Sequence, residues 1–474
     1  MKFARLIGLS VAAMALGRFT VPAQILSALH DFDFSTGAPI PSGRPVLAGG
    51  TLYGVTGRGG SNDAGIVYAV NTDGTGFAVL HDFSSDTNGG LPEGGLLLFG
   101  DNLYGTTSLG GTNGPWGTVF SLKTDGTGFT VLHSFTGDPT IGQHPHPRLT
   151  MDGGILYGAA SGQASPGWGS LFSIQPDGSG FNSFLTFSTP QGLPLTNLDG
   201  EQPQGALIPS GGLLYGTAYG GGPGGGGTVF SVSPDGNNFT VLHAFTNSPD
   251  GAYLRSGLIL VEGTLYGTTW TGGWNNLGTV SSVHTDGTGY QVLHTFLTNG
   301  VDGRNPWTGL GLWHHTLYGT TASGGGTNGS GIIFSINTNG GDYTVFHRFV
   351  LPSGSFTNID GTEPMGDLMI SGNTLYGTTQ RGGSTGGGTL FSLTLPQPRI
   401  TGINVTGSDL VLNATNGVPG ENYVLLASSD VQLSVAQWSA IGTNAPDAGG
   451  NLTFATTDPA APAAAPRFYI LQMQ

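Results

Sequence analysis

Leu103-Tyr104-Gly105-Thr106-Thr107 is followed, after a glycine-rich loop, by Gly117-Thr118-Val119-Phe120-Ser121-Leu122 and, beyond the turn Asp125-Gly126, by Phe129-Thr130-Val131-Leu132-His133-Ser134-Phe135. The apolar run Leu96-Leu97-Leu98-Phe99 precedes them. Val, Thr, Phe and Tyr at alternating positions, between clusters of Gly, Asp and Asn, are typical of β-strands. The stretch therefore predicts four short strands joined by turns.

The same arrangement recurs along most of the chain. Its Leu-Tyr-Gly element begins, at intervals of 51 to 58 residues, at Leu52, Leu103, Leu156, Leu214, Leu265, Leu317 and Leu375. A nearly constant period indicates one supersecondary unit copied in series, and four strands per copy is the size of a β-propeller blade. We therefore expect an all-β fold in which the copies form a seven-bladed β-propeller.

The two ends of the repeat are out of phase. The last copy has Leu375-Tyr376-Gly377 and Gly388-Thr389-Leu390-Phe391, but it lacks the strand with the Val-Leu-His-x-Phe pattern. A spare strand of that kind, Ala28-Leu29-His30-Asp31-Phe32, stands before the first copy. We expect this N-terminal strand to pair with the last blade and close the ring, because closure leaves no free sheet edge there.

Features that recur in most copies are predicted to be structural. The tyrosine of each Leu-Tyr-Gly should pack between blades and bond its hydroxyl to a neighbouring backbone. Tight hairpins need a positive φ, which the glycine after each of these residues supplies: Asp73, Asp125, Asp177, Asp235, Asp286 and Asn339. Six copies carry a histidine in the outer strand, too far apart to share a metal, with Leu185 in the seventh: His30, His81, His133, His243, His294 and His347.

Copies such as LYGTTSLGG…GTVFSLKTDGTGFTVLHSF resemble the tandem repeat of the choice-of-anchor proteins named for Gloeobacter and Verrucomicrobia, over roughly residues 25–395. The Gly-Gly pair after the Tyr-bearing strand is more loosely similar to kelch blades. The resemblance implies a secreted or surface-attached bacterial propeller, usually followed by a C-terminal sorting module. It supplies no catalytic residues.

The N-terminus, Met1–Ala23, is predicted to be a signal peptide. Lys2 and Arg5 precede the apolar run Leu6–Leu16, and small residues follow at the expected cleavage site. The alternative is a buried N-terminal helix, because this is the one stretch with a helical period. The run is too short to span a bilayer, so we expect no membrane span in the mature chain. The protein is then secreted or held at the cell surface of a bacterium, in the periplasm or outside.

The propeller is expected to occupy residues 24–395, and residues 396–398 to form a proline-rich linker, since each proline restricts the chain to extended conformations. The repeat stops there. Residues 399–474 predict a small C-terminal β-sandwich with strands at Ile400–Val405, Leu410–Ala414, Tyr423–Ser428, Leu452–Ala455 and Phe468–Leu471. Sorting, attachment and glycan binding are possible roles for it, and so is simply capping the propeller.

The composition excludes several classes of function. The chain has no cysteine, so disulfides and thiolate chemistry are absent. Only 9% of residues are charged and the net charge is −15. Nucleic acids and anionic membranes require several cationic contacts, so neither is an expected partner. No cofactor is expected, and the chain is predicted to be a monomer.

Binding residues are expected where the copies differ, in the loops of one face of the ring. If blades run outward from the axis, the loops between blades and the loops between second and third strands share that face. Tryptophans beside carboxylates and amides commonly hold sugars, and five lie in these loops: Trp116, Trp168, Trp270, Trp274 and Trp307. The alternative is that these indoles cover glycine-rich loops and fill gaps between blades.

Two weaker patterns concern catalysis and metal binding. Glu93, Glu201 and Glu363 lie between blades, where paired carboxylates near the axis would perform acid/base chemistry. The alternative is that they belong to recurring turns. His144 and His146 have a spacing that suits metal binding from an extended chain, but no third ligand is evident.

The sequence thus favours an exported, non-catalytic propeller that binds glycan or a cell-surface protein. One alternative is a carbohydrate-active hydrolase or lyase with acidic residues near the propeller axis. Another is a purely structural element of the cell surface or of adhesion. The question of catalysis stays open, with the balance against it.

Overall fold

The computed structural model describes residues 7–8, 26–33, 39–138, 140–162, 168–189, 196–326, 329–351, 357–395, 398–406, 408–415, 417, 422–430, 432–447, 450–458 and 467–473. Apart from one 3₁₀ turn, η2 (Val435–Gln437), the regular structure of these residues is β-strand. The predicted all-β class is therefore confirmed. None of the described helices has the length and hydrophobicity required to cross a bilayer.

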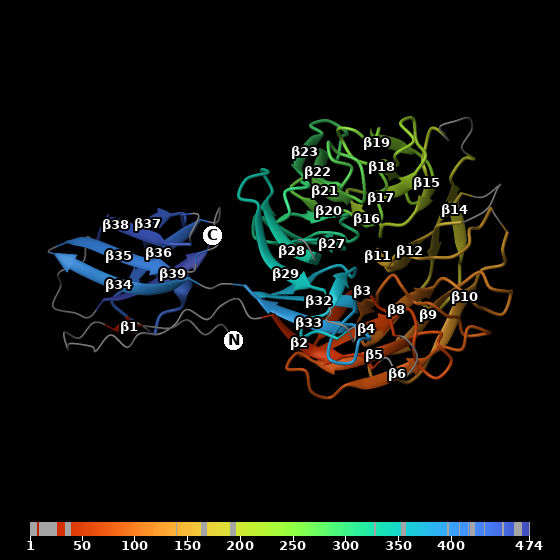
Figure 1. The fold of residues 1–474 in the computed structure, drawn as a ribbon, viewed down its shortest axis with the longest axis horizontal. Helices are drawn as coiled ribbons and strands as arrows, with labels where there is room; N and C mark the ends of the chain where they lie inside the picture. Colours follow the sequence, from red (N-terminus) through yellow and green to blue (C-terminus); the bar gives the residue numbers. More distant parts are fainter. Residues whose placement is uncertain are drawn as a thin grey trace.

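Seven sheets each contain one Leu-Tyr-Gly strand, paired antiparallel with the strands before and after it (Figure 1). The first comprises β3 (Pro41–Ala48), β4 (Thr51–Thr56), β5 (Ile66–Asn71) and β6 (Ala78–Asp82). The second comprises β7 (Leu97–Phe99), β8 (Asn102–Thr107), β9 (Thr118–Lys123) and β10 (Thr130–Ser134). The third comprises β11 (Thr150–Asp152), β12 (Ile155–Ala160), β13 (Ser170–Ile174) and β14 (Asn182–Thr186).

The fourth to sixth sheets repeat this plan with small additions. The fourth comprises β15 (Glu201–Pro203), β16 (Ile208–Ser210), β17 (Leu213–Gly220), β18 (Thr228–Val232) and β19 (Thr240–Ala244). The fifth comprises β20 (Ile259–Val261), β21 (Thr264–Thr269), β22 (Thr279–His284) and β23 (Gln291–Thr295). The sixth comprises β24 (Gly303–Arg304), β25 (Gly311–Trp313), β26 (Thr316–Thr321), β27 (Ser323–Gly324), β28 (Gly329–Asn337) and β29 (Thr344–Val350).

The seventh sheet combines the two ends of the repeat. Its later strands are β30 (Thr362–Pro364), β31 (Met369–Ser371), β32 (Thr374–Arg381) and β33 (Thr389–Thr394). The N-terminal strand β2 (Leu26–Asp31) pairs antiparallel with β33, with Ala28 opposite Phe391 and Leu26 opposite Leu393. The predicted pairing of the spare strand with the last copy is confirmed.

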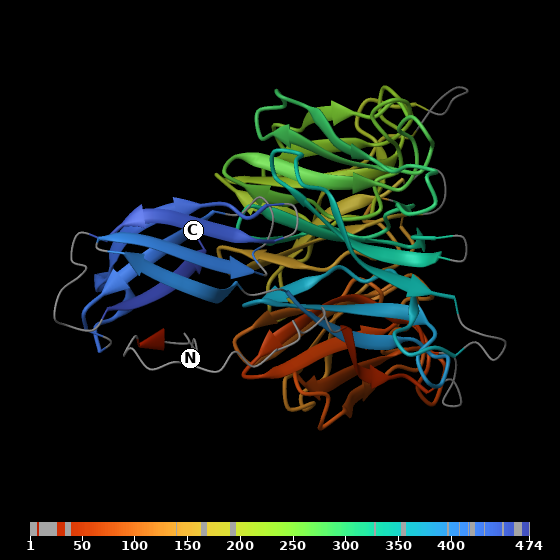
Figure 2. The ribbon, with the colours of Figure 1, turned by 60° about the vertical axis from the view of Figure 1, so that its left-hand side comes forward.

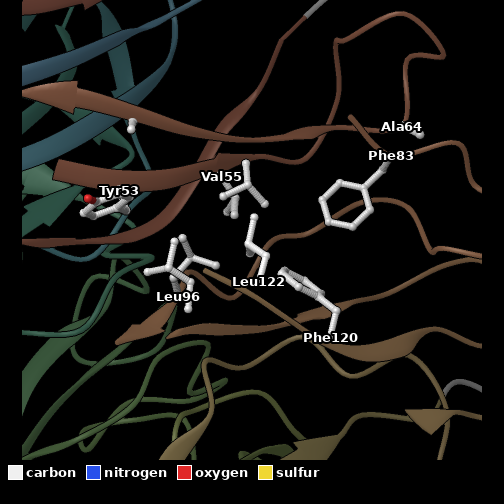
Figure 3. Close-up of a cluster of buried hydrophobic side chains, with 10 residues drawn as sticks. Tyr53, Val55, Ala64, Phe83, Leu96, Phe120 and Leu122 are labelled. Carbon is white, nitrogen blue, oxygen red and sulfur yellow. The ribbon is translucent and has the colours of Figure 1, made fainter. Parts of the chain in front are cut away.

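Buried apolar clusters connect neighbouring sheets. Tyr53 and Val55 of the first sheet pack with Leu96, Phe120 and Leu122 of the second (Figure 3). Clusters of the same kind connect each following pair, up to the sixth and seventh sheets. Full burial of such a side chain contributes about 2–3 kcal/mol.

One further cluster joins the seventh sheet to the first. It combines Leu52 and Tyr68 with Tyr376 and Leu390, and Phe32, which follows β2, packs with them. Every one of the seven sheets therefore shares buried side chains with two others. The cluster between the seventh and the first sheets places the first and the last repeat side by side.

The glycine of Leu-Tyr-Gly leaves room for an aromatic ring from the next strand. A Cβ on Gly105 would lie 2.5 Å from Cζ of Phe120, its cross-strand partner. Five further copies have the same contact, at Gly54, Gly158, Gly216, Gly319 and Gly377. Gly267 differs, because its cross-strand partner is Ser281 and a Cβ there would approach only Leu258 within 4 Å.

The recurring tyrosines are buried between sheets, as predicted, and expose 8% or less of their surface. Packing of the rings between sheets therefore accounts for these positions. The predicted hydrogen bonds from their hydroxyls to neighbouring backbone stay a prediction.

The recurring outer-strand histidines stack on aromatic rings of the following sheet. His133 lies 3.6 Å from the Phe181 centroid with the planes 3° apart. Four more of these stacks join successive sheets, with centroids 3.5 to 3.8 Å apart: His30–Phe77, His81–Phe129, His243–Tyr290 and His294–Tyr343. The predicted structural role is confirmed for these five histidines, and the contact that provides it is a ring stack; the sixth, His347, pairs with Asp360 instead.

The turns before the outer strands also match their prediction. Gly74, Gly126, Gly178, Gly236, Gly287 and Gly340 all have φ between 83° and 87°. The preceding side chain fixes the turn, since Asp125 Oδ1 accepts hydrogen bonds from the backbone N–H and the hydroxyl of Thr127. Turn geometry thus accounts for the recurring Asp-Gly pairs.

Two sheets follow the repeat, at the left of Figure 1 and in blue in Figure 2. One comprises β34 (Arg399–Thr406), β35 (Asp409–Thr415) and β38 (Leu452–Thr457), and the other comprises β36 (Tyr423–Ser428), β37 (Ser439–Asn444) and β39 (Phe468–Met473) together with β1 (Ile7–Gly8). Leu412, Phe454, Leu425 and Tyr469 belong to one buried cluster that unites both sheets. All five predicted strands are present, and β37 is the strand that the prediction missed.

Two residues of the expected signal peptide are described. Ile7 and Gly8 form a short strand opposite Tyr469 and Phe468 on the edge of β39, so the alternative of a buried helix does not hold at these two residues. The rest of the expected signal peptide, residues 1–6 and 9–23, lies outside the described residues, as do linker residues Pro396 and Gln397.

Candidate functional site

The segments that lead into each blade pair with the loops between second and third strands. Tyr253 donates its N–H to Gly226 O and accepts a hydrogen bond at its carbonyl from Trp270 N–H. His144 does the same between Trp116 O and Ser161 N–H. The prediction that these two sets of loops share one face is therefore confirmed.

This double pairing requires a left-handed backbone. The residue that bridges two loops has a φ between 52° and 63° at Leu91, His144, Gln202, Tyr253, Asn305 and Glu363. Such a conformation is uncommon for residues with a side chain. Because it recurs, it belongs to the architecture of the blades and does not single out a site. No residue type predicts this conformation, because the six residues at this position have nothing in common.

Two of the five predicted tryptophans lie together on this face, around Arg255. The guanidinium carbon of Arg255 lies 3.8 Å from the ring centroid of Trp307 and 4.5 Å from that of Trp270. The two indoles meet edge to face with centroids 5.8 Å apart. Cation–π contacts of this kind contribute about 0.5–2 kcal/mol each, so the rings hold the guanidinium in one place.

Two tyrosines complete this group, which we call the Arg255 cluster: Tyr219, Tyr253, Arg255, Trp270 and Trp307. Tyr219 lies 4.8 Å from the guanidinium carbon, and its hydroxyl accepts a hydrogen bond from Arg255 Nη2 at 3.3 Å. Tyr253 stacks on Tyr219 with centroids 5.0 Å apart and keeps 36% of its surface exposed. The cluster thus draws on the loops of three successive blades. Sequence reasoning missed Arg255 and both tyrosines.

The other three tryptophans do not join the Arg255 cluster. Trp116 covers Gly137, where a Cβ would lie 2.5 Å from the indole, and it meets the ring of His144. Trp168 is partly buried, and its Nε1 has no acceptor among the described residues. Trp274 is 77% exposed. Trp116 therefore fills a gap beside a glycine-rich loop, as in the alternative interpretation, whereas Trp270 and Trp307 belong to the Arg255 cluster.

The three candidate carboxylates have separate surroundings. Glu93 accepts a hydrogen bond from Nδ1 of His146 at 2.8 Å, and Glu363 faces Arg381 at 3.6 Å. Glu201 lies opposite Gly220 in the fourth sheet. Burial raises the pKa of Glu201, and its Oε2 has no hydrogen-bond partner among the described residues. No recorded contact brings two of these carboxylates together.

The two candidate metal ligands also point to different partners. Nδ1 of His144 lies 2.7 Å from the carbonyl oxygen of Ser108, whereas His146 pairs with Glu93. Over the described parts of the chain, no group of three or more His, Asp or Glu side chains is arranged to hold a metal ion. The structure therefore does not combine His144 and His146 into one ligand set.

The first strands of the blades approach one another at a second position. A Cβ on Gly309 would lie 3.3 Å from both Gly257 O and Asp367 Oδ2, and Asp367 Oδ1 accepts a hydrogen bond from Gly309 N–H at 2.6 Å. Arg44 and Arg148 hold the equivalent positions of the first and third sheets. Burial and the charge of Arg44 lower the pKa of Arg148 to about 10, although Asp367 acts in the opposite direction. The set of equivalent positions, each eight residues before a Leu-Tyr-Gly element, therefore includes two cations and one carboxylate.

A cavity of about 850 Å³ lies elsewhere, beside β2 and the first sheet. Phe32, Ile66, Phe77 and Val79 provide its apolar wall, and four aspartates line the rest: Asp31, Asp33, Asp63 and Asp82. Asp82 accepts hydrogen bonds from the N–H and hydroxyl of Ser61. The cavity shares no residue with the Arg255 cluster.

Comparison with known proteins identifies the repeat. The model of the Gloeobacter/Verrucomicrobia repeat matches residues 14–222 and 202–421. No curated protein matches this sequence.

Solved structures with a similar fold have low sequence identity. PorZ, an essential surface component of the type-IX secretion system of Porphyromonas gingivalis, is 13% identical with a TM-score of 0.48, over 91% of this chain and 58% of that one. A puromycin-hydrolysing peptidase of Mycobacterium tuberculosis is 14% identical with a TM-score of 0.47, over 86% and 61% of the two chains. A gluconolactonase of Xanthomonas campestris is 16% identical with a TM-score of 0.37, over 63% and 86%.

Proposed function

Because this chain belongs to the Gloeobacter/Verrucomicrobia repeat family, we propose that its repeats form a closed seven-bladed β-propeller that serves an exported protein as a non-catalytic binding module. Two observations support closure. The strand β2 pairs with β33, and a buried cluster joins the seventh sheet to the first. A ring of sheets with no free edge between its ends explains why a spare outer strand precedes the first copy.

The proposal assigns residues 1–23 to a signal peptide, 24–395 to the propeller, 396–398 to a linker and 399–474 to a C-terminal β-sandwich. Cleavage after Ala23 removes β1, so β39 loses the partner that it has in the full chain. The mature protein is then secreted or surface-held. Cell fractionation with mass spectrometry of the N-terminus tests this, and an intact Met1 in a cytoplasmic fraction would contradict it.

The ligand of the module is a glycan or a cell-surface protein. The observation that carries this proposal is the Arg255 cluster, in which four aromatic side chains from three blades gather on the loop face. Aromatic and arginine side chains are the residues that most often dominate binding surfaces. An exposed tyrosine ring next to hydrogen-bonding groups also suits a sugar, which presents an apolar face and a rim of hydroxyls.

A glycan array on the mature protein tests this proposal. We expect selective binding that Tyr253→Ala weakens by about tenfold or more, the effect typical of a central binding residue. Trp274→Ala is the control, because Trp274 is exposed and lies outside the cluster. A second experiment passes an extract of cell-surface proteins over the immobilised mature protein. If neither the array nor this extract shows binding, the molecule is a structural element and the binding proposal fails.

One observation favours the enzymatic alternative. The raised pKa of Glu201 is what a general acid requires, and Glu201 lies opposite Gly220, the residue after Tyr219. Glycosidases use a pair of carboxylates, however, and the buried Oε2 of Glu201 has no hydrogen-bond partner of any kind among the described residues. Hydrolysis of a polysaccharide that is lost in Glu201→Gln, with Glu363→Gln as a comparison, would establish catalysis in place of simple binding.

A further inference from the structure

Arg255 occupies a position at which no other blade has an arginine or a lysine. Counted from the Leu-Tyr-Gly strand, the equivalent residues of the other six blades are Ser42, Glu93, His146, Gln204, Trp307 and Met365. The other blades therefore need no arginine here to form the fold. The aromatic residues that surround Arg255 are equally specific to this part of the ring.

The charge of Arg255 has no carboxylate partner among the described residues. Arg58, Arg381 and Arg467 each pair with an acidic side chain, whereas Arg255 makes one hydrogen bond, to the neutral hydroxyl of Tyr219. Its Nε is buried without an acceptor. Burial lowers the pKa of Arg255, and Tyr219 partly opposes this. A cation that is partly buried without an anion is costly, in a chain where acids outnumber bases by 28 to 13.

The rings around Arg255 cannot all serve as sugar platforms. The guanidinium lies over faces of Tyr219, Trp270 and Trp307, so those faces are occupied. Tyr253 is the exposed member of the cluster, at 36% of its surface, and its ring stacks on Tyr219. The cluster therefore offers one aromatic platform beside one fixed guanidinium. A planar guanidinium matches the two oxygens of a carboxylate in geometry and in charge.

We propose that the Arg255 cluster binds an acidic saccharide, with a uronic acid carboxylate on Arg255 and the sugar ring on Tyr253. This inference rests on the proposed glycan-binding function and specifies its ligand. The guanidinium supplies the electrostatic anchor, and Trp270 and Trp307 hold it in position.

Calorimetric titration of the mature chain with galacturonate and glucuronate oligosaccharides tests the proposal. Their methyl esters are the matched ligands, because they keep the sugar rings and remove the charge. We expect the free acids to bind and the esters to bind about tenfold or more weakly, since hydrogen bonds to charged groups exceed neutral ones by that margin. Equal affinity for acid and ester would overturn the proposal while leaving glycan binding intact.

Substitutions test the residues. Arg255→Lys keeps the charge but not the planar fork, and we expect it and Arg255→Gln to weaken binding of the free acid more than binding of the ester. Thermal unfolding of each variant shows whether it is folded, and the ester comparison needs no variant at all. Tighter binding of sulfated than of carboxylated saccharides would overturn the carboxylate assignment. No binding of any glycan would overturn this proposal and the glycan-binding function together, and would leave a cell-surface protein as the proposed ligand.

Discussion

A planar nitrogen-containing group lies on an aromatic ring in two regions of this molecule: an imidazole in the outer strands and the guanidinium of Arg255 on the loop face. Over the described parts of the chain, the first contact recurs and the second does not. In the outer strands, His133 stacks 3.6 Å from Phe181, and the same contact recurs between four other pairs of sheets. On the loop face, Arg255 lies 3.8 Å from Trp307, and no other blade repeats the contact within the described residues. A contact shared by five pairs of neighbouring sheets serves to assemble them, whereas the contact found at one place is the one that we propose recognises a ligand.

The two regions also differ in how their polar groups are satisfied. Several outer histidines face an aspartate, as His347 faces Asp360 at 2.7 Å and His294 faces Asp302 at 3.0 Å. Arg255 has a tyrosine hydroxyl instead. Nε2 of His81 and of His133 is buried without a partner among the described residues, so the pairing with a carboxylate holds for His243, His294 and His347 only. The difference from Arg255 is that these three histidines have a carboxylate partner and Arg255 has none in the described part of the chain.

The largest effect is expected from removing β2. A chain that starts at Ser35 lacks one recurring stack, His30–Phe77, and the buried Phe32, whose loss alone costs about 3–5 kcal/mol. It also leaves the edge of β33 unpaired. We expect a strongly lowered melting temperature and aggregation, measured by calorimetry and light scattering. A chain that starts at Gln24 is the matched control, and equal melting curves for the two chains would contradict a closed ring.

The next effect concerns the glycine slot. Gly105→Ala places a methyl group against Phe120, and overpacking of this kind costs about 1–3 kcal/mol. Gly267→Ala meets only the flexible end of Leu258, so we expect a smaller loss. Urea unfolding measures both free energies. Equal losses would mean that the cross-strand aromatic ring does not decide the residue type at this position.

Much of this architecture follows from the sequence, because repetition makes local signals unambiguous. Seven copies of Leu-Tyr-Gly predict seven equivalent strands, and the spare strand at Ala28 predicts the pairing with Phe391. The loop face could not be predicted in the same way. Trp270 and Trp307 are brought together by blades that differ in sequence, and Arg255 becomes informative only when its surroundings show that it lacks a carboxylate.

Acid should weaken the outer strands selectively. Burial lowers the pKa of His30, His81 and His133 from 6.5, and that of His133 to about 4. Below pH 6.5 the unfolded chain therefore binds more protons than the folded chain. The contribution of these histidines to the free energy of unfolding is largest above pH 6.5 and decreases as the pH falls from 6.5 toward 4. His133→Leu, which copies Leu185 of the third blade, should flatten this dependence. An unchanged pH profile would mean that the stack does not require a neutral ring.

The smallest effect is expected at Trp274, and it sharpens the comparison between the two regions. Like Arg255, Trp274 occurs in a loop of one blade only, but it is 77% exposed and stacks on no described ring. Trp274→Ala should change the free energy of unfolding by no more than about 0.5 kcal/mol and leave uronate binding unchanged. A loss of binding equal to that of Tyr253→Ala would show that the ligand site extends beyond the Arg255 cluster. A residue that differs between copies is therefore only a candidate for the proposed site. Arg255 and the rings around it differ from Trp274 because they surround a charge that has no carboxylate partner among the described residues.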